Sequence, residues 1–110
     1  MLNDRIPTEL CQSAITASAA TYFTNASASY RTQMSQIFLC NTGASSRIVT
    51  LYKNGVAVNN QIANSITLPA NTSTIIDTKL VFTGTQTFSA KQDVGTDVTI
   101  TACGVVEQIV

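Results

Sequence analysis

Short apolar stretches alternate with turn-forming residues along almost the whole chain. The clearest alternation lies in 97–106, where Val98, Ile100 and Ala102 are separated by Thr99 and Thr101. A period of two residues is typical of a β-strand with one buried face. No period of 3.6 residues persists for 12 positions, which is about the length of an average helix. The pattern therefore predicts strands throughout and no long helix.

These stretches predict an all-β fold. The turns between them are rich in Gly, Asn, Ser and Asp, and the strands follow one another about every 8 to 12 residues, which is typical of a β-sandwich or small barrel. Asn54-Gly55 is the strongest turn signal and predicts a tight type I′ hairpin that pairs 51–53 with 56–58. We expect one compact, jelly-roll-like β-sandwich of about eight strands, with apolar segments at 15–23, 30–40, 47–53, 56–58, 62–68, 72–82, 87–91, 97–106 and 105–110.

The stretch 30–40 is apolar at both parities. Met34, Phe38 and Cys40 share one parity, and Ile37 and Leu39 have the other. A strand that is apolar on both faces is expected to be covered on both faces. Gly104, near the end of the last long alternation, predicts a bulge or a break there.

The first 15 residues differ from the rest because they contain Pro7, several charges and no sustained period. We expect an extended N-terminal arm at 1–15, followed by the sandwich at 16–110. The arm either lies on another surface or frays, as chain ends often do. The N-terminus has no basic segment followed by an apolar one, so no signal peptide is predicted and assembly in the cytoplasm is expected. Apolar runs are too short for a membrane span of about 20 residues.

Uncharged polar residues dominate the composition. Only 11% of the residues are charged, the formal net charge is zero and histidine is absent, whereas Thr, Ser, Asn and Gln occupy more than a third of the chain. Without a basic excess there is no electrostatic footprint for nucleic acid. A neutral surface provides little repulsion between copies. This composition suits a protein that packs against other protein.

No constellation of residues indicates catalysis or a cofactor. There is no histidine base for a nucleophile, no glycine-rich phosphate loop and no closely spaced cysteine pair for zinc. Asp93 and Asp97 flank a glycine turn, where such residues usually bond to their own backbone, and a calcium site would need more oxygen ligands. Cys11, Cys40 and Cys103 are expected to be free thiols, although a disulfide between two of them remains an alternative. The sequence predicts no enzyme, no metal and no cofactor.

About two thirds of the chain, from Gln33 to Val106, resembles a small β-sandwich that recurs among virion structural proteins of tailed bacteriophages. The matching segments read QIFLCNTGASSRIVTLYKNG, NSITLPANTSTIIDTKLVF and GTQTFSAKQDVGTDVTITACGVVE. These are motifs of a fold and say little about function. Copies of the domain occur in head decoration, neck and tail-associated roles, and this sequence carries no second module.

The resemblance implies a capsid cement or decoration protein on the virion surface, working as a homotrimer that clamps subunits of the major capsid protein. A neck, tail or baseplate component is one alternative, and a glycan- or receptor-binding module is another. In the cement hypothesis the arm and the first aromatic residues make the contacts between subunits. The expected contact residues are Ile6, Pro7, Leu10, Tyr22, Phe23 and Tyr30.

Overall fold

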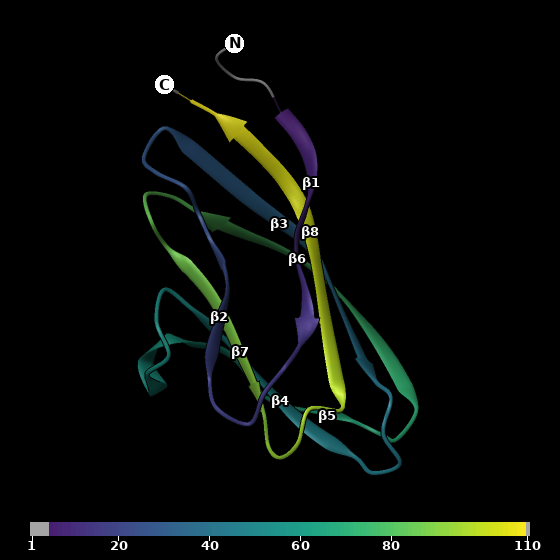
Figure 1. The fold of residues 1–110 in the computed structure, drawn as a ribbon. Helices are drawn as coiled ribbons and strands as arrows, with labels where there is room; N and C mark the ends of the chain where they lie inside the picture. The colour runs from purple at the N-terminus through teal and green to yellow at the C-terminus, as the bar shows by residue number, and fades with distance from the viewer. Residues whose placement is uncertain (1–4, 110) are drawn as a thin grey trace.

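The computed structural model describes residues 5–109 as eight antiparallel strands in two sheets that pack face to face (Figure 1). Sheet A has the order β1-β8-β3-β6, and sheet B has the order β2-β7-β4-β5. The predicted all-β sandwich is confirmed. The strands are β1 (Arg5–Ala14), β2 (Ala20–Thr24), β3 (Tyr30–Asn41), β4 (Arg47–Lys53), β5 (Gln61–Leu68), β6 (Thr72–Phe82), β7 (Thr87–Gln92) and β8 (Val98–Gln108), with a short 3₁₀ helix η1 (Val58–Asn60) before β5.

The connections give the order of a jelly roll. The chain changes sheet after every strand except between β4 and β5, which are neighbours in sheet B. As a result the first strand pairs with the last, and β3 lies between β8 and β6. Two sheets with these interleaved connections are the two Greek keys of the jelly-roll architecture.

The segment expected to be an arm is extended and lies on the sandwich itself. Arg5–Ala14 forms the edge strand β1 and pairs with β8 from Arg5 opposite Glu107 to Ala14 opposite Thr99. Ile15 follows directly, is fully buried, and donates its backbone N–H to the carbonyl of Val98 at 2.8 Å. Residues 1–4 of the expected arm, and Val110, lie outside the described residues.

A bulge in β3 decides which apolar residues enter the core. Met34 pairs with Gly104 and Gln36 pairs with Cys103, so Ser35 is the extra residue. The parity predicted for this strand is therefore wrong beyond the bulge. Met34, Ile37 and Leu39 are all buried. Phe38 points to the opposite face and is 36% exposed, so this chain alone does not cover both faces of β3.

Gly104 lies within β8 and marks no break, contrary to the sequence expectation. A Cβ atom at this position would lie 2.0 Å from the carbonyl oxygen of Gln33 and 2.8 Å from the Cα of Met34. Glycine is required because the backbone of β3 approaches β8 closely beside the bulge, where a side chain cannot fit.

The tight hairpin predicted at Asn54-Gly55 is also wrong. Both residues have positive φ angles, as the turn signal implies, but the chain then continues through η1 and pairs only from Gln61, which lies opposite Tyr52. The carboxamide of Asn60 holds this wider loop. Its Nδ2 donates to the carbonyls of Lys53 and Asn54 at 3.2 and 3.0 Å, and its Oδ1 accepts the N–H of Ala57 at 3.2 Å.

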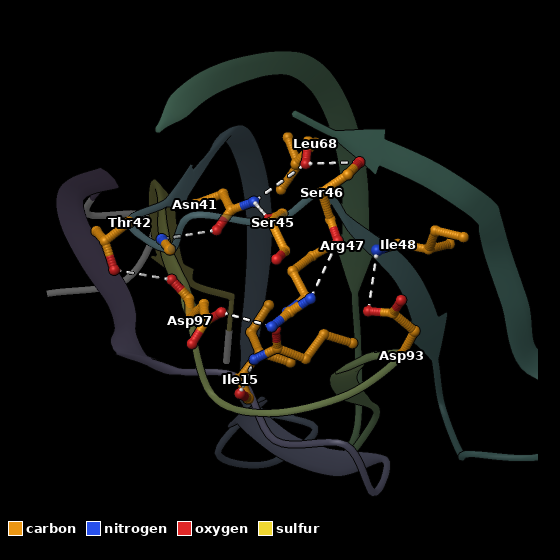
Figure 2. Close-up of polar contacts among 12 residues, drawn as sticks. Ile15, Asn41, Thr42, Ser45, Ser46, Arg47, Ile48, Leu68, Asp93 and Asp97 are labelled. Carbon is orange, nitrogen blue, oxygen red and sulfur yellow. Dashed lines mark hydrogen bonds and ion pairs between the residues drawn. The ribbon is translucent and has the colours of Figure 1, made fainter. Parts of the chain in front are cut away.

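Side chains close one end of the sandwich where the loops meet (Figure 2). Asn41 is buried at the end of β3 and donates to the carbonyls of Ser45 and Leu68 at 2.8 and 3.1 Å. Asp97 pairs with Arg47 at 2.8 Å, and Asp93 accepts the N–H of Ile48 at 3.2 Å. The two aspartates therefore bond to β4 and its flanking loop, not to their own turn as the sequence suggested.

The close approach of β3 to β8 predicts a large penalty for Gly104→Ala. Its methyl group would overlap backbone atoms that cannot rotate away, so we expect a loss of about 2–3 kcal/mol in the free energy of unfolding, measured by urea denaturation. Gly84→Ala is the matched control. Gly84 has a φ of +59° and nothing within 4 Å of the new methyl group, so only backbone strain of about 1 kcal/mol is expected. Equal losses for the two variants would contradict the close packing.

Candidate assembly surface

Reactive side chains do not converge in the described structure. Within residues 5–109, no three Cys, Asp or Glu side chains gather as a metal site would require. The described part of the chain also has no helix that is long and apolar enough to cross a membrane. The candidate functional features are therefore surfaces, and the broadest lies on sheet A.

The outer face of sheet A is the side that points away from sheet B. Side chains alternate between the two faces of a strand, so the residues between the buried ones in β3 and β8 define it. Strand register then extends the face across all four strands. Successive rows across it contain Arg5, Glu107 and Arg31; Pro7, Val105, Gln33 and Val81; Glu9, Cys103, Gln36 and Asp77; Gln12, Thr101, Phe38 and Ile75; and Ala14, Thr99, Cys40 and Ser73.

Apolar side chains are exposed on this outer face. Phe38, Ile75 and Val81 are 36%, 59% and 44% exposed, and Val105 is half-buried beside them. Phe38 lies directly opposite Ile75 in the pairing of β3 with β6. A contiguous exposed apolar patch on a small domain marks an interaction site more often than scattered single residues do.

A hollow of about 350 Å³ occupies the end of the outer face nearest the chain termini, and it is lined by Arg5, Arg31, Gln33, Val81, Val105 and Glu107. Arg31 Nη2 lies 2.8 Å from Glu107 Oε1, and Arg5 is opposite Glu107 in the strand pairing. Two guanidinium groups therefore flank one carboxylate. Because half of the Arg31 side chain is exposed, this ion pair adds at most about 1 kcal/mol to stability.

The charges on the strands of sheet A balance. Its four strands carry three basic residues and three acidic ones, namely Arg5, Arg31, Lys79, Glu9, Asp77 and Glu107. Arginine lies at the hollow, whereas Glu9 and Asp77 share a row nearer the middle of the face. The face is therefore neutral overall but has a basic end and an acidic row.

Three of the six predicted contact residues lie near the terminal end of sheet A. Ile6 is 59% exposed in β1. Pro7 is exposed on the outer face opposite Val105. Tyr30 is half-buried at the start of β3, opposite Gln108. These three residues have surface left for a partner.

The other three predicted residues are used mostly within the chain. Leu10, Tyr22 and Phe23 pack against the buried core. The ring of Phe23 meets that of Phe82 edge to face, with centroids 5.5 Å apart, and the hydroxyl of Tyr22 accepts the N–H of Thr16 at 3.2 Å. Sequence reasoning missed the outer-face residues Phe38, Ile75, Val81 and Arg31. The available signal was the apolar pattern of 30–40 at both parities.

All three cysteines are free, as predicted. Cys40 and Cys103 lie half-buried on the outer face of sheet A. Cys11 packs against the core from β1, opposite Ala102. Burial raises the pKa of the Cys11 thiol, and the nearby Glu9 carboxylate adds to this, although a hydrogen bond with the backbone of Ala102 lowers the pKa in part.

Comparison with known proteins finds likeness in structure alone. The sequence matches no family model and no curated protein. A chain from Bacillus endospore appendages, which form a family of disulfide-linked pili, superposes with a TM-score of 0.56 at 12% identity, over 100% of this chain and 93% of that one. A chain of the T13 particle of infectious bursal disease virus superposes with a TM-score of 0.58 at 11% identity, over 97% of this chain. This chain spans about a third (32%) of the viral one. These identities show a shared fold.

The placement of Phe23 and Ile6 predicts opposite effects of substitution. Phe23→Ala removes an edge-to-face ring contact with the core, so we expect a loss of about 2–3 kcal/mol in the free energy of unfolding. Ile6→Ser changes an exposed side chain and is expected to shift it by less than about 0.5 kcal/mol. Chemical denaturation measures both. A loss from Ile6→Ser as large as that from Phe23→Ala would contradict the described position of β1.

The raised pKa of Cys11 predicts slow alkylation in the folded protein. Burial disfavours the thiolate, so its reaction with iodoacetamide should accelerate only at a pH above the usual thiol range of about 8–9. The same thiol should react at ordinary pH in urea. By linkage, its contribution to stability is full at lower pH and is lost as the pH rises through the raised pKa. Equal rates for Cys11 in folded and unfolded protein at pH 8.5, followed by mass spectrometry, would refute this.

Proposed function

We propose that this chain is a non-enzymatic structural protein that works as one of many copies in a larger protein assembly. The jelly-roll order of its strands, with the broad outer face of sheet A left uncovered, is the observation that carries the proposal. Apolar side chains on a folded domain of this size stay soluble best when another protein covers them. The low charge supports the same role, because uncharged polar residues are cheaper to desolvate at contacts than charged ones.

The specific form that we propose is a virion cement or decoration protein. Such a protein assembles in the host cytoplasm and clamps neighbouring subunits of the major capsid protein on the capsid surface. The fold shared with a chain of a viral particle supports this, as does the sequence resemblance to phage virion proteins. The resemblance implies a homotrimer as the working unit. Ile6, Pro7 and Tyr30 are proposed as contact residues because their side chains retain exposed surface.

A filament subunit is the second candidate. The likeness to the endospore appendage chain favours it, since that superposition covers nearly the whole of both chains. Cys11, Cys40 and Cys103 have no disulfide partner within this chain and are available for bonds between copies. Non-reducing electrophoresis of the assembled protein, before and after dithiothreitol, distinguishes the two forms. A ladder of covalent multimers supports the filament.

Copy number tests the assembly proposal. We expect purified chain mixed with capsids from its own source to co-sediment at hundreds of copies per particle, counted by quantitative mass spectrometry and located by cryo-electron microscopy. About a dozen copies or fewer would indicate a neck, tail or baseplate part. Filaments formed by the chain alone would indicate the second candidate. A chain that joins no particle and forms no multimer between 1 and about 100 µM contradicts the proposal.

A further inference from the structure

We infer that the outer face of sheet A docks against the same face of a second copy of this chain. The inference rests on the proposed function, since it names the surface through which copies of an assembling protein meet. Its starting point is β3. The strand is apolar at both parities, and the chain buries Met34, Ile37 and Leu39 but leaves Phe38 uncovered on the other side.

The size of the face matches that of a stable protein contact. Its four strands have 10, 11, 12 and 11 residues. At about 3.3 Å per residue and about 4.8 Å between strands, the face measures roughly 35 by 19 Å, or about 700 Å². A standard interface buries about 800 Å² on each partner. Face-to-face packing of two such sheets is also the arrangement already present inside the sandwich.

The charges favour a second copy as the occupant. A contact between identical surfaces must be complementary to itself. Three basic and three acidic residues make sheet A neutral, and its basic hollow at Arg5 and Arg31 lies along the strands from the acidic row of Glu9 and Asp77. Two copies laid in opposite directions bring the basic end of each toward the acidic row of the other. A strongly acidic or strongly basic partner would meet repulsion from half of these charges.

The native cysteines report directly on this contact. Cys40 and Cys103 lie on the outer face, and Cys11 packs against the core on the opposite side of the sheet. Docking of the outer faces should slow the reaction of Cys40 and Cys103 with N-ethylmaleimide at least tenfold, relative to dilute monomer. The rate at Cys11 should stay unchanged, which makes it an internal reference. Peptide mass spectrometry gives the three rates separately.

The matched experiment removes apolar surface from the face. We expect the double variant Phe38→Gln/Val81→Gln to keep its fold by circular dichroism and to weaken self-association about 100-fold, as measured by size-exclusion chromatography with light scattering. Val56→Gln/Val58→Gln is the control. It alters two valines that are 50% and 78% exposed in the loop between β4 and β5, away from sheet A, and it should associate like the wild type.

Two results support the inference together: oligomers of even number with protected Cys40 and Cys103, and loss of association in the outer-face variant only. An odd-numbered oligomer, unprotected thiols in the assembled protein, or equal association of the two double variants overturns it. None of these three results affects the proposed function, because copies would still assemble through another surface. Failure to join any particle or multimer refutes the proposed function instead. If an outer-face variant unfolds, the thiol protection of the wild type decides alone.

Discussion

The position of β3 between β8 and β6 governs the rest of this structure. The strand pairs on both sides over nearly its whole length, and both pairings shift register at Ser35. One extra residue at this point turns Ile37 and Leu39 into the core and sends Phe38 outward. Without the bulge, each side chain beyond it would change face, because the side-chain period of a strand is two. The bulge therefore sets both the composition of the core and the apolar character of the outer face.

Two buried asparagines hold the chain on either side of this central strand. Asn25, just before β3, donates to the carbonyls of Tyr30 and Gly84 at 2.9 and 2.8 Å and accepts the hydroxyl of Thr32 at 2.7 Å. Asn41 does comparable work at the other end of β3. A carboxamide offers both donors and acceptors without a charge to desolvate. A protein with few charged residues can thus fix its loops firmly while its exterior stays neutral.

Local pattern predicted most of the strands, whereas contacts between distant segments decided the details. The strand at 47–53 and the inward positions of Phe88, Val98 and Ile100 follow from alternation alone. The bulge at Ser35 did not, because it depends on the close approach of β8 at Gly104. The hairpin at Asn54-Gly55 failed because the carboxamide of Asn60 supplies a competing set of hydrogen bonds.

The candidate surface was predicted less well than the fold, for a related reason. Leu10, Tyr22 and Phe23 looked available in the sequence, but they pack against the core. The residues that form the outer face are far apart in the chain, and strand register alone brings Arg5, Arg31 and Val81 to one hollow. That register also constrains synthesis. Because β8 separates β1 from β3, residues 5–14 have no pairing partner until residues 98–108 have been made. Sheet A must therefore form after translation of its last strand, through sequence-distant contacts of the kind that make folding slow.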